Sequence, residues 1–280
     1  MVGVDYGIVV PVRNEAALLP LTVLRLLSAT AGENARIVWV CNGCSDDSAA
    51  IIRHLAGPDA EVIVLPLPGK IAALQAGDTA LGDLFPRFYV DADCWIGPGG
   101  LAPRVHALHA GDADLVAPAL DYDVSRSSWL SARIAACWLA LPHGSSLAYS
   151  MVLGVSAAGR ARWGRWPDVT GDDIFVSATI PAARRLRIAG ALATSFAPAD
   201  FAGWIRMRAR WRRGEVELAA MGLSVPRHPR QYRALFSQLL RPDTAIGAWA
   251  FVAARLAAQH QARPSATTAW LPDRRVNGRD

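Results

Sequence analysis

The sequence has few charged residues and lacks a long apolar run. Asp, Glu, Lys and Arg make up 19% of the 280 residues and apolar residues make up 52%, a balance that excludes disorder for most of the chain. A membrane-spanning helix needs about 20 apolar residues, whereas the apolar stretch near the C-terminus, Ala245 to Ala254, has ten. We expect no transmembrane helix. Because the first residues do not resemble a secretory signal, we expect a cytoplasmic protein, with peripheral attachment at the inner face of the membrane as the alternative.

Cysteine and lysine are also rare. Four cysteines in a chain of this length do not make a disulfide framework, and Cys41 and Cys44 lack the second pair that a zinc site requires. Their spacing suits a redox dithiol, although an Asn-Gly turn between small buried residues explains it as well. Lysine occurs once, at Lys70, among 29 basic residues.

Basic charge is concentrated toward the C-terminus. Residues 201–280 contain 14 Lys and Arg against 5 Asp and Glu, a net charge of +9, whereas residues 1–200 contain 15 against 19, a net charge of −4. A basic segment of this kind is typical of a membrane-surface or nucleic-acid-binding module, which is the alternative to an enzyme. Since the segment lacks the spacing of base-stacking motifs, we expect no nucleic acid partner. The segment from Ala245 to Ala254, followed by Arg255, is a candidate for peripheral membrane contact.

The first hundred residues alternate between short β-branched runs and Ala/Leu-rich segments. This period is that of βαβ units and predicts an open, mostly parallel α/β sheet whose strands are buried on both faces. The predicted strands are Tyr6–Val12, Arg36–Cys41, Glu61–Leu65 and Arg87–Asp91, and the predicted helices are Leu21–Ser28, Ala49–Leu55 and Ile71–Ala80.

Polar residues follow each of these strands. Ligands of such sheets bind beyond the carboxyl ends of the strands, where the sequence has Arg13-Asn14-Glu15, Asn42-Gly43, Gly69-Lys70 and Asp91-Ala92-Asp93. In an extended chain Asp91 and Asp93 point to the same side and can share a divalent cation that bridges two phosphates. The alternative for this triplet is a solvated turn.

Later segments extend the pattern less regularly. We expect helices near 101–110, 128–141 and from 171, strands near 114–120 and 151–155, and a largely helical chain from Phe201. We predict a catalytic domain over 1–220, with a nucleotide-sugar half at 1–120 and an acceptor half at 121–220. A helical extension over 221–262 and a disordered tail over 263–280 follow.

In their order and spacing, these motifs resemble those of the family 2 glycosyltransferases, which have the GT-A fold. The resemblance covers about residues 6–215, and its motifs are Ile8 to Glu15, Asn42 to Asp46, Gly69-Lys70 with Ala73, Leu74 and Gly77, Asp91-Ala92-Asp93, and Gly171-Asp172-Asp173. It implies a Rossmann-like, mostly parallel open sheet with flanking helices. It also implies an inverting, metal-dependent transferase that moves one sugar from a nucleoside-diphosphate donor to an acceptor hydroxyl.

The resemblance assigns donor contacts to the strand ends. Pro11, Arg13 and Glu15 would lie under the nucleotide, and Asn42 would meet the edge of the base. Lys70 would lie near the phosphates, with surface solvation as the alternative. Because many relatives have Asp at the position of Asn42, the base is open: a UDP-sugar is the first expectation, and GDP- and TDP-sugars are the others.

Two groups of residues would act on the metal and the acceptor. Asp91 would face the ribose and diphosphate, and Asp93 would hold Mg²⁺ or Mn²⁺ with Asp91. A closing loop would bring His228 to the metal. Asp173 resembles the general base of the family, with Asp172 as the fallback, although acidic residues at this place also favour a helix N-terminus without any catalytic role.

The segment Met207 to Trp211 resembles the Q-x-x-R-W signature of processive polysaccharide synthases. Because Met207 replaces the Gln and no transmembrane helix follows, we predict transfer of a single sugar. Arg210 would contact the diphosphate, and Trp211, Trp166 and His143 are candidates for contact with a sugar or with the acceptor. The acceptor itself, a saccharide or a lipid-linked molecule, cannot be read from the sequence.

Overall fold

The computed structural model describes residues 5–142, 147–225 and 230–261. The predicted tail at 263–280 lies outside these ranges. The described chain forms two compact units: unit 1 comprises residues 5–120, 150–168 and 179–194, and unit 2 comprises residues 121–142, 147–149, 169–178, 195–225 and 230–261. The predicted division at residues 120 and 220 stays a prediction.

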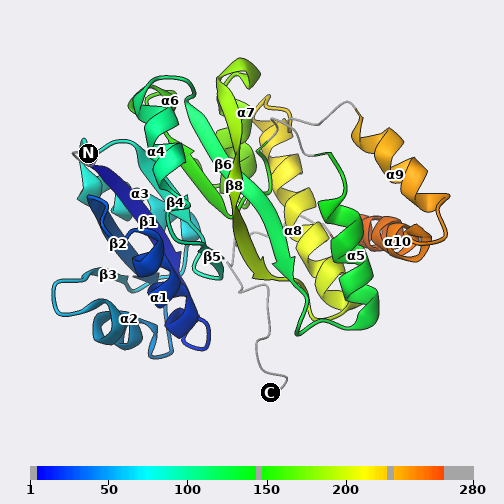
Figure 1. Ribbon diagram of the computed structural model, residues 1–280, viewed down its shortest axis with the longest axis horizontal. Helices are drawn as coiled ribbons and strands as arrows, with labels where there is room; N and C mark the ends of the chain where they lie inside the picture. Colours follow the sequence, from blue (N-terminus) through cyan, green and yellow to red (C-terminus); the bar gives the residue numbers. More distant parts are fainter. Residues whose placement is uncertain (1–4, 143–146, 226–229, 262–280) are drawn as a thin grey trace. The chain divides into compact units, whose positions relative to one another are not determined.

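Unit 1 contains most of an eight-stranded sheet with the order β3-β2-β1-β4-β7-β6-β8-β5 (Figure 1). Strands β1, β2, β3 and β4 are parallel, and β7 runs antiparallel to both β4 and β6. The strands are β1 (Tyr6–Val12), β2 (Ala35–Asn42), β3 (Glu61–Leu65), β4 (Arg87–Val90), β5 (Cys94–Ile96), β6 (Leu115–Asp123), β7 (Val152–Val155) and β8 (Arg185–Phe196), and the last residues of β6 and β8 belong to unit 2.

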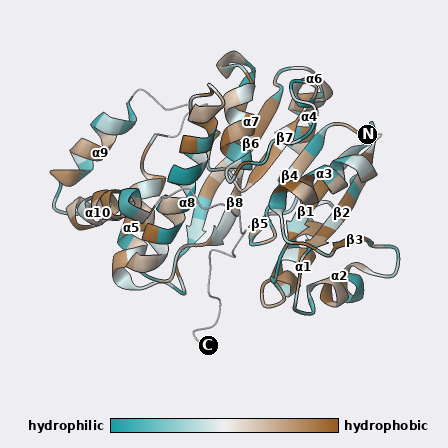
Figure 2. Ribbon diagram, turned by 180° about the vertical axis from the view of Figure 1, so that it is seen from behind, coloured by the Kyte–Doolittle hydropathy of each residue, from teal (hydrophilic) through white to brown (hydrophobic). Residues whose placement is uncertain are grey.

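Helices cover both faces of this sheet. The even-numbered residues of β1, from Tyr6 to Val12, share a core with buried residues of the first two helices, whereas the odd-numbered Gly7 and Val9 lie against the third helix, where a side chain on Gly7 would meet Leu81. All seven residues of β1 are therefore buried, as a strand covered on both faces requires. The central strands are largely brown in Figure 2. The helices of unit 1 are α1 (Leu19–Ala29), α2 (Ser48–Ala56), α3 (Lys70–Leu81), α4 (Ala102–His109) and α6 (Ala157–Arg160).

Unit 2 is built mainly from helices. Its main core joins residues of α5, α8 and α10 around Trp138, Trp204 and Phe251. Side-chain oxygens cap two of these helices, since Ser128 accepts from the amide of Ser131 at α5 and Asp200 accepts from the amide of Gly203 at α8. The helices are α5 (Trp129–Leu139), α7 (Asp172–Thr179), α8 (Phe201–Ala220), α9 (Gln231–Leu239) and α10 (Ala245–Gln261).

The mixed α/β sheet with flanking helices confirms the predicted fold class. Several features differ from the sequence prediction. No strand was predicted at β5 or β8 and no helix at α6, and Asp91, predicted as the last residue of a strand, lies just after β4 in a turn. None of the helices in the described ranges has both the length and the apolar content to cross a bilayer.

Candidate active site

The loop after β1 is held by the loop after β2. Asn14 has a positive φ of 53°, a conformation that Asn adopts more readily than most residues, and its Oδ1 accepts from the amide of Ser45 at 2.8 Å. The amide of Glu15 donates to Ser48 Oγ at 3.1 Å, and the amide of Ala16 donates to Asp46 Oδ2 at 3.0 Å. Three bonds across about 30 residues of sequence therefore fix the backbone around the predicted nucleotide residues.

Arg13 follows β1 directly and has a guanidinium suited to an anion. Its Nε and Nη1 atoms are buried, and neither has a hydrogen-bond partner within the described ranges. A buried guanidinium N–H without an acceptor is costly, and a phosphate oxygen is an acceptor that such a group binds well. The residue therefore fits a diphosphate. Pro11, by contrast, lies inside the fully buried β1, and its predicted place under the nucleotide stays a prediction.

Asn42 is completely buried at the end of β2. Its Nδ2 donates to the carbonyl of Val12 at 2.9 Å, and its Oδ1 accepts from the amide of Gly69 at 2.9 Å. Both polar atoms of the amide thus tie together the ends of β1 and β2 and the start of α3. The contact with the base stays a prediction, and the bracing role is one that the sequence pattern did not indicate.

The DxD segment forms a turn rather than an extended chain. The amide of Cys94 donates to the carbonyl of Asp91 at 3.3 Å, while the amide of Asp91 donates to the carbonyl of Met151 at 2.9 Å. The expectation of an extended chain from Asp91 to Asp93 is therefore wrong, because the chain turns between β4 and β5. That the two carboxylates share a divalent cation stays a prediction. Both residues are partly exposed.

Lys70 is the first residue of α3, and its Nζ lies 2.7 Å from Asp91 Oδ1. The predicted phosphate contact stays a prediction, but the lysine is now placed at a helix N-terminus, a site that favours anions. Within the described residues there is no group of three or more His, Cys, Asp or Glu side chains that could hold a metal ion. A divalent ion on the two carboxylates would need further ligands from phosphate and water, as Mg²⁺ commonly does.

The two cysteines at the end of β2 differ in ionisation. Cys41 is fully buried, and its hydrogen bond to Cys44 lowers the pKa of Cys44 to about 6 and raises the pKa of Cys41. Both are free thiols. Cys44 is therefore the more readily ionised of the two thiols, and nothing observed assigns it a reaction.

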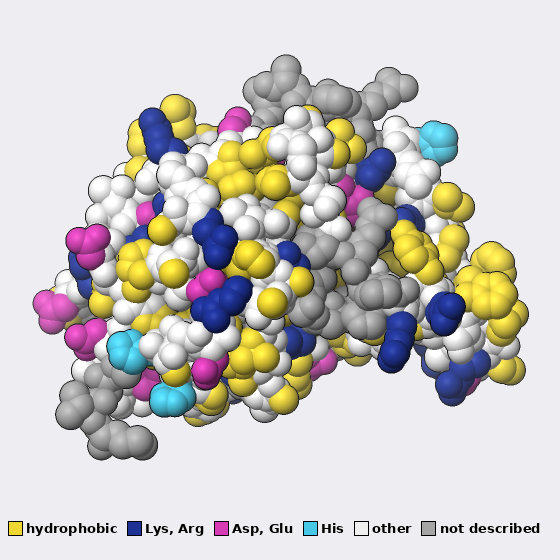
Figure 3. Space-filling view, turned by 90° about the horizontal axis from the view of Figure 1, so that it is seen from above, with side chains coloured by type: hydrophobic (Ala, Val, Ile, Leu, Met, Phe, Trp, Pro, Cys, Tyr) yellow, Lys and Arg dark blue, Asp and Glu magenta, His cyan; other side chains and the backbone are white. Residues whose placement is uncertain are grey.

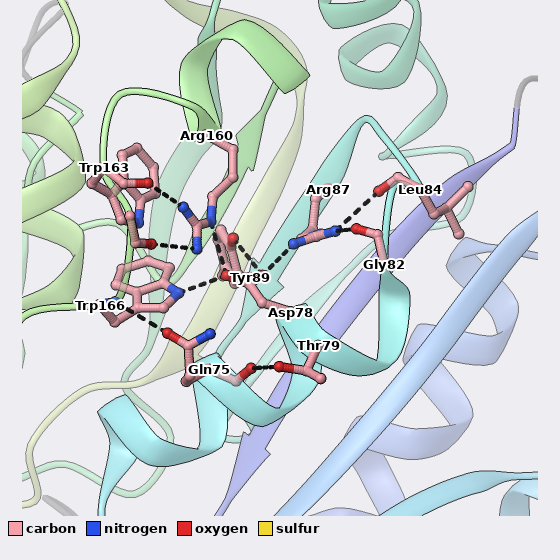
Figure 4. Close-up of polar contacts among 11 residues, drawn as sticks. Gln75, Asp78, Thr79, Gly82, Leu84, Arg87, Tyr89, Arg160, Trp163 and Trp166 are labelled. Carbon is pink, nitrogen blue, oxygen red and sulfur yellow. Dashed lines mark hydrogen bonds and ion pairs between the residues drawn. The ribbon is translucent and has the colours of Figure 1, made fainter.

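Asp78 on α3 is the centre of a buried polar network that the sequence pattern did not indicate (Figure 4). Its Oδ1 accepts from Arg87 Nη1 at 2.6 Å and from the Tyr89 hydroxyl at 2.8 Å. Its Oδ2 accepts from Arg160 Nε at 2.8 Å and from Trp166 Nε1 at 2.7 Å. One carboxylate therefore joins α3, β4 and the segment after α6.

Trp166 is buried by this network. Its indole ring contacts Tyr89 edge-on at 5.1 Å and lies 5.3 Å from the ring of Trp163. The structure thus gives the ring packing partners, and its contact with a sugar stays a prediction.

The acidic pair opens α7 in unit 2. Asp172 is buried, whereas Asp173 is partly exposed and is the more accessible of the two. Two residues before Asp172, Thr170 donates through its amide and its hydroxyl to the two carboxylate oxygens of Glu217 on α8, at 2.6 and 2.8 Å. Close approach of Gly171 to Gly214 adds to this fixation, because a side chain on Gly214 would meet the backbone of Gly171. Helix α8 therefore sets the position at which α7 and its acidic pair begin.

The predicted synthase-like segment lies in the middle of α8. Met207, which stands where synthases have Gln, is a buried core residue. Trp211 packs its ring 4.5 Å from Tyr149 and 5.0 Å from Trp138, and Arg210 is partly exposed. The roles of Trp211 in sugar contact and of Arg210 in diphosphate contact stay predictions.

Tyr149 links the aromatic cluster to the acidic residues of unit 2. Its hydroxyl donates to Glu215 Oε1 at 2.7 Å. Burial, with Glu215 and the negative charge of Asp173, raises the pKa of Tyr149 far above its usual value. The hydroxyl thus stays protonated and acts as a donor. The other two predicted site residues, His143 and His228, lie outside the described residues.

Comparisons with known proteins agree with this architecture. A mannosyltransferase from Pyrobaculum calidifontis, PcManGT, solved with GDP-Man and Mn²⁺, superposes with a TM-score of 0.58 at 20% identity, over 94% of this chain and 76% of that one. Residues 1–349 of S. aureus TarS, solved with UDP-GlcNAc, superpose with a TM-score of 0.51 at 11% identity, over 92% of each chain. At these identities the likeness shows the GT-A type of fold and no more.

The sequence comparison identifies the family. No curated protein matches the sequence. The model of glycosyl transferase family 2 matches residues 7–149, which is more than half of the chain and includes every strand-end motif of unit 1. The chain therefore belongs to glycosyl transferase family 2.

Proposed function

We propose that this protein transfers a single sugar, with inversion, from a nucleoside-diphosphate sugar to an acceptor hydroxyl, with the help of a divalent cation. The observation that carries the proposal is the set of groups beyond the carboxyl ends of β1, β3 and β4 in unit 1. Arg13 offers buried N–H groups that have no acceptor among the described residues. Lys70 adds a positive charge, and the carboxylates of Asp91 and Asp93 add hard oxygen ligands. Phosphate and a divalent metal together suit this set.

Each side chain has a distinct task in this proposal. Arg13 binds the diphosphate, and Lys70, at the N-terminus of α3, adds positive charge beside it. Asp93, with Asp91, would hold Mg²⁺ or Mn²⁺. When bound, the ion offsets negative charge on the leaving diphosphate.

Asp173 is the general base of the proposal. The acceptor oxygen forms a bond to the anomeric carbon while the bond from that carbon to the diphosphate oxygen breaks. The proton of the acceptor hydroxyl passes to the Asp173 carboxylate, and the nucleoside diphosphate leaves. Support for Asp173 over Asp172 comes from its greater exposure, because a base must reach the hydroxyl of a bound acceptor.

Transfer of a single sugar is the third part of the proposal. Met207 fills the core of unit 2, and its side chain offers no amide to a growing chain.

The similar structures contain GDP-Man and UDP-GlcNAc, so GDP- and UDP-sugars are the first donors to test, with TDP-sugars next. The acceptor class is a saccharide or a lipid-linked hydroxyl.

Removal of the metal is expected to stop the reaction. With Mn²⁺, one class of nucleotide sugar should release its nucleoside diphosphate when membrane lipid extract or a saccharide mixture is supplied. Excess EDTA should lower this rate by at least about a hundredfold, since charge on the leaving group is then unbalanced. The readout is a coupled assay for nucleoside diphosphate, with Mg²⁺ or Mn²⁺ added back as the control. Full activity in EDTA would refute the dependence on a metal ion. If no donor released its nucleoside diphosphate, the transferase proposal itself would be refuted.

A further inference from the structure

Helix α9 exposes an apolar stripe to solvent. Tyr232 and Phe236 belong to α9, and Leu240 directly follows its last residue with a helical backbone conformation. The three follow one another at intervals of four residues, so they lie on the same side. All three are more than half exposed. Large apolar side chains at helical spacing normally face a core. Within the described ranges, no core covers this stripe.

Helix α10 is apolar on two opposite sides. One side is packed: Phe251 lies 5.7 Å from the ring of Trp138, and a side chain on Gly247 would meet the carbonyl of Arg133 on α5. The other side carries Ile246, Trp249 and Leu256, which are spaced by three and seven residues. One side of the candidate membrane segment Ala245–Ala254 therefore belongs to the core of unit 2, and the other side faces solvent.

The two stripes are neighbours. The guanidinium of Arg255, the residue before Leu256, lies over the ring of Tyr232 at 5.9 Å. The six side chains together form what we call the α9–α10 face. Their exposed fractions lie between 53% and 70%, and they are Tyr232, Phe236, Leu240, Ile246, Trp249 and Leu256.

Positive charge surrounds this face. Neither α9 nor α10 contains Asp or Glu. Between residues 230 and 261 the sequence has four arginines and one acidic residue, Asp243, which is paired with Arg241 at 3.1 Å. Helices α9 and α10 lie at the right-hand end of Figure 1. At the same end of Figure 3, hydrophobic side chains lie beside those of Lys and Arg.

We propose that the α9–α10 face binds the surface of an anionic lipid bilayer. Exposed Trp, Tyr and Phe suit the boundary between headgroups and acyl chains. Arginines beside them can extend their guanidinium groups to lipid phosphates, at about 1 kcal/mol of attraction per basic residue near the surface. A soluble protein partner would also cover apolar side chains, but the excess of arginine over acid favours a surface of negative charge.

The proposal is tested by flotation of the full chain with vesicles. Wild type should float with vesicles of phosphatidylcholine and phosphatidylglycerol and much less with phosphatidylcholine alone. In the double variant Phe236→Ser/Trp249→Ser, binding to the anionic vesicles should weaken by at least about tenfold, because two large apolar side chains no longer enter the lipid. Arg233→Gln/Arg255→Gln should lose the preference for the anionic lipid.

Controls separate membrane binding from misfolding and from the transferase activity. Leu24→Ser, which changes an exposed leucine of α1 in unit 1, should float as wild type does. Both double variants should keep the melting temperature and the release of nucleoside diphosphate to a water-soluble acceptor, so a failure of the transferase proposal leaves this test intact. Equal flotation of wild type and Phe236→Ser/Trp249→Ser would overturn the proposal. The proposal would also be overturned if wild type did not float with the anionic vesicles, whether or not sedimentation showed the protein to be a dimer.

Discussion

Replacement of Asp173 by Asn is expected to reduce sugar transfer by about 10²–10⁴-fold, the usual contribution of a positioned general base. The amide keeps the shape of the side chain but cannot accept the proton of the acceptor hydroxyl. Since Glu217 and Gly214 fix the start of α7 through Thr170 and Gly171, the local fold should survive the change. The measurement is the transfer rate at saturating donor and acceptor, with nucleotide affinity measured in parallel.

Asp172→Asn is the matched control for this change. Asp172 is adjacent in sequence and also lies in the first turn of α7, but it is buried. We expect its variant to retain far more activity than Asp173→Asn. If Asp173→Asn keeps more than a few per cent of the rate while Asp172→Asn loses it, then Asp172 is the base. If both variants remain active, the two aspartates have no catalytic role and only stabilise the N-terminus of α7.

Replacement of Asp78 by Asn is expected to destabilise unit 1 by about 3–5 kcal/mol, the usual cost of removing one partner of a buried ion pair. The side chains of Asp78 and Arg87 are 4% and 3% exposed. In the Asn variant, an NH₂ group would replace one carboxylate oxygen, for example the Oδ2 that accepts from Arg160 and Trp166. Donors would then face a donor, and their hydrogen bonds would be lost. For a chain of this size the melting temperature should fall by about 6–20 °C.

Asp83→Asn is the control for Asp78→Asn. It makes the same chemical change five residues further along, at an exposed aspartate of the same unit, and should leave the melting temperature unchanged. Thermal unfolding followed by circular dichroism measures both variants. A fall of less than about 2 °C for Asp78→Asn would mean that the guanidinium groups of Arg87 and Arg160 find other partners or water.

The sequence predicted the first four strands of the sheet well for a physical reason. Strands buried on both faces are continuous apolar runs, and β1, which is such a strand, has the predicted limits. β3 also has its predicted limits, but its predicted burial on both faces is wrong, because it lies at the edge of the sheet and its residues are partly exposed. The run Arg185–Phe196 alternates small, basic and apolar residues around Gly190 and has no such signature, so β8 was not predicted. Its place in the sheet depends on strands distant in sequence.

The candidate site could be predicted only as far as local motifs reach. Strand-end residues such as Arg13 and Asp91 stand out because they interrupt apolar runs. The network of Asp78 joins residues separated by 9 to 88 positions, and no local pattern connects such partners. The bracing by Asn42 and the fixation of Thr170 by Glu217 escaped prediction for the same reason, because each depends on the backbone of another element.

Metal-dependent binding of a nucleoside diphosphate to wild type and to Asp93→Asn tests the proposed donor site most directly. A thermal-shift panel of UDP, GDP, TDP and CDP, each with and without Mn²⁺, provides the measurement. A ligand at 100 times its Kd stabilises the folded state by about 2.7 kcal/mol. We predict a Mn²⁺-dependent rise in melting temperature for one nucleotide in wild type and its loss in Asp93→Asn, with the melting temperature of the free protein unchanged. An equal rise in both proteins would contradict the role of Asp93, and no rise for any nucleotide would contradict the donor site itself.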